Sequence, residues 1–501
     1  MPYLQSSTRA PWSAAVPLQA GRFESLLPEH RGCNRITDFS AYAPFSVPSA
    51  EPPPMLGFAD YQLEPQYPGR RRQGAGRAVF YDGYYLKGTG RTPLALNWID
   101  RGDSAHATGH MSPSAATREL VVSRYLRAKG LGAHIVACEG LLLAPLDPAL
   151  ADPYRGYYAE QGIPLAPSDQ SMQAISVKRA DFARWSNLWW LAQHSAGSPD
   201  DLLEFAWLTE HFASVRGPDE LALPHTRDCT PSSIAAALGA AFERGLASFE
   251  AFYRGGVFWG SYHNNFTLDG RFLDLELPLI VGEPLFCKHA TRGPKARAGL
   301  AEPPVAHRGR AFGTEILFYL RQLRNVLDCL DSRLGFLETA TFSAEVRTFI
   351  VQLREALRAA FDGLHPLRDR GAQAELLAGL YAETGASDSA VAGLVAVQLA
   401  EEHDKRSPPA LPGVLAPLDT APVEAGVDID VIVMAGAPGP RSPQAAEERA
   451  LLLAVYSELD QIREPQAYLE RLEAWLGVIE REVRPRAPFE QVSSVPLYSA
   501  P

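Results

Sequence analysis

Residues 61–180 alternate short strand-length runs with a single helical stretch, and this alternation restricts the possible folds most. The runs are rich in apolar, aromatic and β-branched residues and span four to six positions each: Ala78–Tyr81, Tyr84–Lys87, 133–138 and 173–177. Across residues 115–129, apolar side chains recur at the spacing of one helix face, as at Val121 and Tyr125. We therefore expect a β-sheet covered by one crossing helix.

The rest of the chain shows mainly helical patterns, with one β-rich insert. Helical periodicity covers three regions: 185–255, 313–401 and 445–482. The insert at 257–276 carries the turn signal Asp269 and Gly270. Residues 1–60 are rich in Pro and Ser, and residues 407–443 in Pro and Gly, which indicates extended or loosely packed chain.

This order predicts an α+β protein with a protein-kinase-like two-lobe fold, in which a β-rich N-terminal lobe precedes a helical C-terminal lobe and additional C-terminal helices. The expected parts are an extended N-terminal arm at 1–60, a β-rich nucleotide-binding lobe at 61–182, a helical lobe at 183–405 with an inserted metal-binding hairpin at 257–276, a Pro/Gly-rich linker at 406–444, and a C-terminal helix and tail at 445–501. Such a layout places a nucleotide site in the cleft between the lobes.

Charge and cysteine usage exclude several classes of function. The chain of 501 residues has a formal net charge of −11, which argues against nucleic acid or an anionic membrane as its main partner. Its five cysteines are scattered and odd in number, as in a cytoplasmic protein with reduced thiols. The N-terminal stretch lacks the apolar region of a signal peptide. No apolar run approaches the roughly 20 residues that a membrane span needs.

Several polar residues match the needs of phosphoryl or nucleotidyl transfer. Such chemistry needs a glycine-rich loop over phosphates, a lysine that pairs with them, an acid that holds the lysine, and metal ligands. The candidates in chain order are Gly74, Gly76, Arg77, Lys87, Glu119, Asn265 and Asp274. The turn at Asp269 and Gly270 would bring Asn265 and Asp274 together across a hairpin, as oxygen ligands for Mg²⁺. The simpler alternative is a solvent-exposed lysine before a hairpin, because glycine turns and exposed lysines are common.

Four motifs in this order resemble the selenoprotein O family of kinase-like protein adenylyltransferases. YYLKGTGRTP at 84–93 resembles the family's LKGSGRTP, and QGAGRA at 73–78 resembles its QLGDGRA. TRELVVSRYLRAKGLGAH at 117–134 is similar to its REYLVSEAMHALGIPT helix, and residues 257–276 resemble its HGVMNTDNMSI…DYG segment. The resemblance covers about residues 70–290 and does not extend to the C-terminal 200 residues.

The resemblance implies a kinase-like fold that binds ATP with Mg²⁺ or Mn²⁺ and transfers AMP to hydroxyl side chains. It implies the following roles: Lys87 as the phosphate-pairing lysine, Glu119 as its partner acid, Arg77 and Arg184 (in ADFARWSN) as phosphate contacts, the glycines Gly74, Gly76, Gly88 and Gly90 as the loops around the nucleotide, and Asn265 and Asp274 as metal ligands. The nine-residue step from Asn265 to Asp274 equals the family's spacing.

One departure changes the expected mechanism. The family's acidic base falls on Asn264, and an amide cannot accept a proton from a hydroxyl group at neutral pH. Three explanations are open: a nucleophile that needs no base, a substitute base such as His263 or Glu276, or nucleotide binding without turnover. We therefore expect an ATP-dependent transferase that moves AMP or a phosphoryl group to a protein or small-molecule acceptor. The alternatives are a ligase that activates a carboxylate as an adenylate and a nucleotide-binding pseudoenzyme or interaction module.

Overall fold

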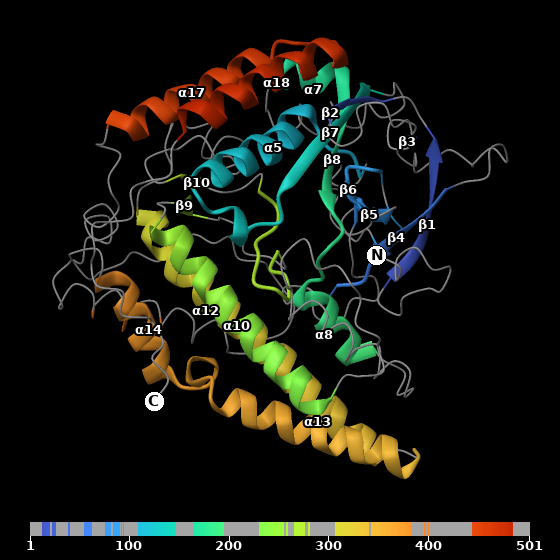
Figure 1. The fold of residues 1–501 in the computed structure, drawn as a ribbon, viewed down its shortest axis with the longest axis vertical. Coiled ribbons are helices and arrows are strands. Elements are labelled where there is room, and N and C mark those ends of the chain that lie inside the picture. The colour runs from blue at the N-terminus through green and yellow to red at the C-terminus, as the bar shows by residue number, and fades with distance from the viewer. Residues whose placement is uncertain are drawn as a thin grey trace, which may run out of the picture.

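The chain forms an α+β fold, with a sheet at one side and helices packed against it and beside it (Figure 1). The computed structural model describes residues 13–20, 23–26, 39–40, 55–62, 76–81, 84–90, 92, 94, 109–146, 165–194, 230–254, 257–258, 265–275, 279–280, 306–339, 342–382, 392, 395–396, 399 and 443–483. The expected linker at 406–444 therefore lies outside the described residues up to position 442.

The main sheet has eight strands in the order β2-β7-β8-β6-β5-β4-β1-β3, and all of its pairings are antiparallel. The strands are β1 (Ser13–Ala20), β2 (Glu24–Leu26), β3 (Phe39–Ser40), β4 (Met55–Asp60), β5 (Ala78–Tyr81), β6 (Tyr84–Lys87), β7 (Cys138–Pro145) and β8 (Met172–Arg179). A separate pair consists of β9 (Val257–Phe258) and β10 (Leu279–Ile280). Strand β6 lies inside the sheet, between β5 and β8, so its backbone is fixed on both sides.

The helices fall into two groups. In one group, three helices contact strands of the sheet: α5 (Pro113–Ala128), α7 (Pro167–Ser171) and α18 (Pro465–Glu482), and α17 (Pro443–Leu459) packs on α18. The other group extends away from the sheet: α8 (Trp185–His194), α10 (Pro231–Arg254), α12 (Ala306–Glu338), α13 (Ala344–Asp362) and α14 (Arg370–Ala382). Short 3₁₀ turns lie at Gly132–His134 and His365–Leu367.

Helix α5 confirms the helix expected at 115–129. Its first turn begins cleanly because the Ser112 hydroxyl accepts a hydrogen bond from the Ala115 backbone N–H and Pro113 occupies the first turn. Val121 and Tyr125 are buried as their spacing predicts. Glu119 shares this buried surface, which is unusual for a carboxylate and indicates a specific partner.

The N-terminal arm expected at 1–60 is wrong for the residues of this region that the structure describes, because nearly all of them are in strands of the main sheet. Strands β1 to β4 join the main sheet, and Ser13 lies opposite Asp60 in the β1–β4 pairing. The partner strands are separated by long stretches of sequence, so no local pattern records their hydrogen bonds. Pro and Ser content indicated a loop, whereas backbone pairing between distant segments decided the outcome.

Two further boundaries differ from expectation. Residues 133–138 do not form a strand, because the backbone of His134 and Val136 hydrogen-bonds to Phe272 instead (2.9 Å each) and β7 starts only at Cys138. The single helix expected at 445–482 is two helices. Glu464 is extended before Pro465, and a proline is tolerated at the start of a helix but not in its interior.

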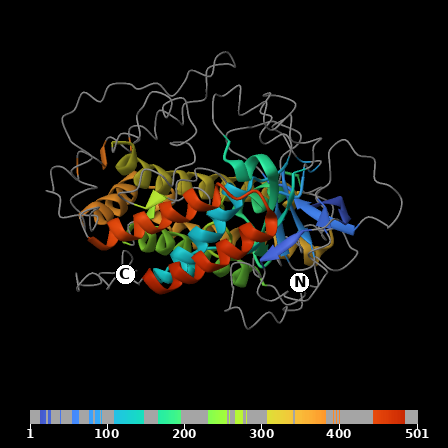
Figure 2. The same ribbon diagram turned by 90° about the horizontal axis from the view of Figure 1, so that it is seen from above.

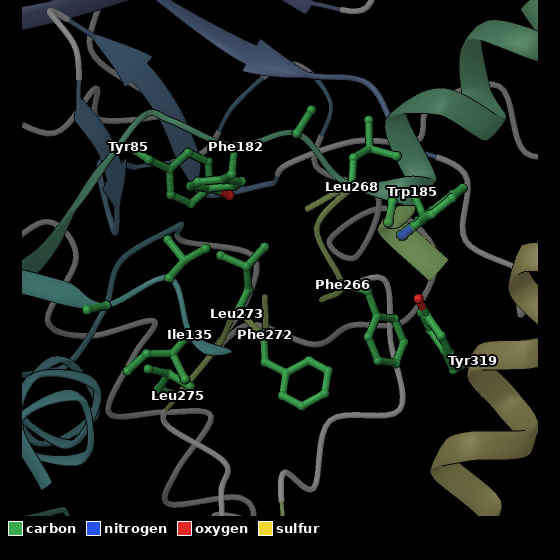
Figure 3. Close-up of a cluster of buried hydrophobic side chains, with 14 of the residues drawn as sticks. Tyr85, Ile135, Phe182, Trp185, Phe266, Leu268, Phe272, Leu273, Leu275 and Tyr319 are labelled. Atoms are coloured by element: carbon green, nitrogen blue, oxygen red, sulfur yellow. The ribbon is translucent and has the colours of Figure 1, made fainter. Parts of the chain in front are cut away.

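A continuous hydrophobic core connects the sheet to α5, α8, α10 and α12 by way of residues 265–275. Figure 3 shows Phe266 facing Tyr319 of α12, and their ring centroids are 4.8 Å apart. Phe272 packs on Phe249 of α10 at the same centroid distance. The segment that carries Asn265 and Asp274 is therefore held by aromatic packing on both sides of its turn.

The C-terminal helices α17 and α18 lie along α5, as Figure 2 shows from above. The Tyr468 hydroxyl hydrogen-bonds to the Thr117 hydroxyl (2.8 Å), and the Tyr125 hydroxyl donates to Glu448 (3.0 Å). Glu448 also forms a buried ion pair with Lys129. These contacts fix α5 from the face opposite the sheet.

An arginine–aspartate cluster joins α12 to α13, and it makes stability depend on acid pH. Arg354 and Arg358 of α13 both donate to Asp331 of α12, at 2.9 and 2.6 Å. The hydrogen bonds from Arg358, with those from Arg354, lower the pKa of Asp331 to about 2. The folded value is below the unfolded value of about 4, so the stabilisation is complete above that value and is lost as pH falls toward 2.

We expect Asp331→Asn to lower the free energy of unfolding by roughly 1 kcal/mol at pH 7, a value that allows for partial exposure of the site. The difference from the unaltered protein should shrink between pH 5 and pH 2.5, as measured by urea unfolding. Asp328→Asn is the control, because Asp328 is more exposed and pairs with Arg324 at 3.5 Å in the same helix. An equal difference at both pH values would contradict this assignment.

Candidate functional site

Lys87 ends β6 and points to the face of the sheet that α5 covers. Successive residues of a strand alternate between faces, so Tyr85 shares this face with Lys87. Across the β6–β8 pairing, Lys87 lies opposite Ser176 and Tyr85 opposite Lys178. All four side chains are buried on the same face, and the lysine expected to be solvent-exposed in the simpler alternative is only 5% exposed.

Glu119 is the first partner of Lys87. The Lys87 ammonium donates to Glu119 Oε1 at 2.7 Å, and the Glu119 side chain has no exposed surface. Its second oxygen, Oε2, accepts from the Ser176 hydroxyl at 2.6 Å and from the Lys178 ammonium. The structure therefore brings Lys87 and Glu119 together as their order in the sequence predicts, and it adds a second lysine that sequence reasoning missed.

Asp274 is the second partner of Lys87, with which it forms an ion pair. Its side chain is 25% exposed, so solvent reaches the cluster at this residue. Among the described residues other than glycine, only Asp274 has a positive φ, at 59°. A positive φ is energetically unfavourable for most non-glycine residues, and residues in such conformations are concentrated at functional sites.

A tight hairpin brings Asp274 close to Asn265. The Leu273 N–H donates to the Asn265 carbonyl at 2.9 Å, and Phe266 pairs with Phe272. Gly270 makes the turn with a φ of 80°, and a Cβ there would lie 2.7 Å from the backbone of α10. The expected hairpin is therefore present over the described residues 265–275, and β9 and β10 on either side of it pair with each other.

Arg184 connects this hairpin to the sheet. Its guanidinium donates to Asn265 Oδ1 at 2.9 Å and to the Tyr85 hydroxyl at 2.6 Å, and the residue is 6% exposed. Burial alone would lower the pKa of Arg184, but Tyr85, Asp60 and Asp274 raise it above its usual value. Sequence reasoning assigned Arg184 to phosphate contact, whereas the structure commits two of its nitrogens to protein partners.

The glycines after Lys87 have a structural reason that differs from the expected one. Gly88 and Gly90 have φ angles of 103° and 100°, and a Cβ on Gly88 would lie 2.5 Å from the Ala174 carbonyl. Their N–H groups donate to the carbonyls of Arg77 (2.7 Å) and Gly109 (3.1 Å). These N–H groups are therefore not available to a phosphate, and the predicted place of both glycines in a loop around the nucleotide stays a prediction.

Of the other expected site residues, two lie in the described part of the chain and four do not. Gly76 and Arg77 precede β5, and the Gly76 carbonyl accepts from the Thr92 N–H at 3.0 Å. Gly74, His263 and Asn264 lie outside the described residues, as does Glu276. Their roles stay predictions.

Asp60 is a second residue that sequence reasoning missed. It ends β4, is fully buried, and accepts hydrogen bonds from Gln62 and Asn187 at 2.8 Å each. It is close enough to Tyr85 and Arg184 to shift the pKa values of both. Burial, with Asp60 and Asp274 nearby, raises the pKa of Tyr85 far above its usual value, so Tyr85 stays a neutral phenol. The sequence shows only an Asp at the end of a strand-length run, within the region interpreted as an arm.

The side chains of Asp274 and Asn265 in the hairpin fit a hard cation that takes its other ligands from bound molecules. Asp274 supplies a carboxylate and Asn265 an amide oxygen, which are ligands that Mg²⁺ accepts. Asn265 Oδ1 also accepts a hydrogen bond from Arg184. Within the described part of the chain, no group of three or more His, Cys, Asp or Glu residues is placed to hold a metal. A carboxylate and an amide oxygen would suit a metal that takes phosphate oxygens and water as its other ligands.

The whole chain was compared with protein families and with curated proteins. No family model matches the chain, and no curated protein is significantly similar to it. The resemblance to selenoprotein O proteins consequently depends on the quoted motifs. None of the helices in the described ranges is long and apolar enough to cross a membrane.

A separate groove of about 590 Å³ lies between β7 and the start of α18, lined by residues that include Glu24, Leu143 and Glu464. It contains none of the residues of the Lys87 cluster. The buried, paired charges of the Lys87 cluster are a more specific sign of a chemical site than the size of this groove.

Proposed function

We propose that this protein is an ATP-dependent transferase with a divergent selenoprotein O-like kinase fold, which moves AMP or a phosphoryl group to an acceptor. One observation carries the proposal: the Lys87 ammonium lies between Glu119 of α5 and Asp274 of the hairpin. Protein kinases need the same three elements, a strand lysine, a helix glutamate and a metal-binding aspartate.

The strand order supports a kinase-like reading of the sheet. Among the five strands β4 to β8, the lysine is on the third in chain order, β6, and α5 lies between the third and the fourth. Kinases carry their phosphate-pairing lysine on the third strand and its glutamate on the following helix. The remaining strands, β1 to β3, extend the sheet beyond this arrangement.

In the proposed reaction, the protein positions a triphosphate and offsets its charge. Asp274 would turn from Lys87 to the metal ion, which leaves the Lys87 ammonium, held in place by Glu119, for a phosphate oxygen. Asp274 and Asn265 would hold a Mg²⁺ or Mn²⁺ ion, which offsets the charge that develops on the phosphates when it is bound.

The acceptor follows from the residue at the base position. With Asn264 there, an acceptor that is already nucleophilic, such as an amine or a carboxylate, needs no proton removal by this residue. A carboxylate acceptor would give an acyl adenylate or acyl phosphate. A hydroxyl acceptor would require His263 or Glu276 as the base.

Transfer of label from ATP tests the proposal. The protein is incubated with Mg²⁺ and ATP labelled in either the α or the γ phosphate, together with protein and small-molecule acceptors. Label from the α position on an acceptor identifies AMP transfer, and γ label identifies phosphoryl transfer. Pyrophosphate exchange that depends on a small acid identifies carboxylate activation. Thermal stabilisation by ATP without any transfer would contradict the transferase and identify a nucleotide-binding module.

A further inference from the structure

A second buried lysine shares the Glu119 carboxylate with Lys87. Lys178 of β8 is 1% exposed, and its ammonium bonds to Glu119 Oε2, while Lys87 bonds to Oε1. The Ser176 hydroxyl donates to the same Oε2 at 2.6 Å. The two oxygens of Glu119 are therefore divided, with one facing Lys87 and the other held by β8.

This division has an electrostatic consequence. Two ammonium groups, of Lys87 and Lys178, face two carboxylates, of Glu119 and Asp274. If Asp274 turned to a metal ion, Lys87 and Glu119 alone would form a neutral pair, and a neutral pair attracts a phosphate only weakly. Lys178 makes the group of three positive, so that one positive charge remains beside the phosphates.

We propose that Lys178 is a positioning residue, which neutralises and orients Glu119 so that the charge of Lys87 is left for the phosphates of a bound nucleotide. This inference rests on the function proposed above. Lys178 does not itself contact the ligand: it is enclosed between β8 and α5, and its ammonium donates to Glu119 and to Ser176 (3.3 Å).

The pairing geometry explains why β8 is suited to this task. Lys178 and Ser176 are two residues apart on a strand, so both side chains point to α5. Glu119 is one helix turn before Ser123, whose hydroxyl donates to the Glu119 carbonyl (2.6 Å) and accepts from the Cys138 N–H. The helix at Glu119 is thus fixed to the sheet through both its side chain and its backbone.

The test compares a charged and an uncharged ligand. Dissociation constants are measured for a non-hydrolysable ATP analogue with Mg²⁺ and for adenosine, using the unaltered protein, Lys178→Met and Lys178→Arg. Loss of the compensating charge should weaken binding of the analogue by about tenfold or more in Lys178→Met and leave adenosine binding unchanged. Lys178→Arg retains the charge and should bind the analogue with nearly unaltered affinity. A purely structural role would weaken both ligands equally.

A double variant guards against misfolding of Lys178→Met, in which buried Glu119 has one partner fewer. Glu119→Gln with Lys178→Met removes both charges and leaves the net charge beside Lys87 as it was. This variant lacks the carboxylate that holds Lys87, so it need not match the unaltered protein, but it should bind the analogue more tightly than Lys178→Met does. Equal effects of Lys178→Met on analogue and adenosine, or a double variant that binds the analogue no more tightly than Lys178→Met, would overturn the inference. Failure of the unaltered protein to bind the analogue would overturn the proposed function itself, and this inference with it.

Discussion

Lys87→Met is expected to abolish detectable ATP-dependent stabilisation of the protein. The ammonium would supply a charge-assisted hydrogen bond to phosphate, worth about 2–3 kcal/mol, so affinity for Mg·ATP should fall roughly 30- to 150-fold. Methionine has a similar length and keeps the apolar contacts of the lysine stem. The measurement is calorimetric titration of the protein with a non-hydrolysable ATP analogue in the presence of Mg²⁺. Thermal unfolding of the protein is recorded with and without the analogue.

Lys129→Met is the matched control for this experiment. Lys129 is also buried and also forms an ion pair, with Glu448, but it lies at the end of α5 beside α17. Removing one partner of a buried pair costs about 3–5 kcal/mol of stability, so the control should be destabilised as well. It should nevertheless bind the analogue as the unaltered protein does. Unchanged binding in Lys87→Met, or equal losses in both variants, would exclude Lys87 from the ligand site.

Asp274→Asn is expected to remove most of the metal dependence of nucleotide binding. Because Asp274 is paired with Lys87 in the structure, a nucleotide without metal must compete with this carboxylate for the ammonium. The amide has the same size and tolerates a positive φ, but it carries no charge. In the presence of a chelator, the variant should bind the ATP analogue about tenfold more tightly than the unaltered protein. Added Mg²⁺ should then improve its binding little.

Asp181→Asn provides the comparison for this variant. Asp181 has a similar exposed fraction, 29% against 25%, and pairs with Arg271 rather than with Lys87. The same chemical change there should leave both the metal-free affinity and the effect of Mg²⁺ as they were. Weaker metal-free binding by Asp274→Asn would show that Asp274 does not compete with the nucleotide.

The parts of the site that could be predicted from sequence are those that local patterns record. Lys87 ends a strand-length run and Glu119 lies on the one crossing helix, so their order placed them on facing elements. The Asp269 and Gly270 turn likewise predicted that Asn265 and Asp274 would come together. In each case a periodicity or a turn signal carried the information.

The parts that could not be predicted depend on contacts between distant segments. Lys178 was overlooked because a lysine at the end of an apolar run usually reaches solvent, and its burial requires α5 to cover it. Asp60 was hidden in a Pro-rich region whose strand pairs with Ser13–Ala20. The ion pair of Lys129 with Glu448 joins residues 319 positions apart, which no local pattern records.

The glycines after Lys87 show a second reason why a sequence pattern does not determine the role of a residue. A glycine-rich turn has the same sequence whether it approaches a phosphate or the protein's own backbone. Gly88 is required here by a positive φ and by the close approach of the Ala174 carbonyl. The three-dimensional contacts of the glycine, and not its sequence, separate these two reasons.

The most direct test is the structure of the complex with a non-hydrolysable ATP analogue and Mg²⁺. The account predicts phosphate oxygens within hydrogen-bond distance of the Lys87 ammonium, with Asp274 turned from Lys87 to the ion and Glu119 still on Lys178. A nucleotide bound elsewhere, with Lys87 still joined to Asp274, would contradict it.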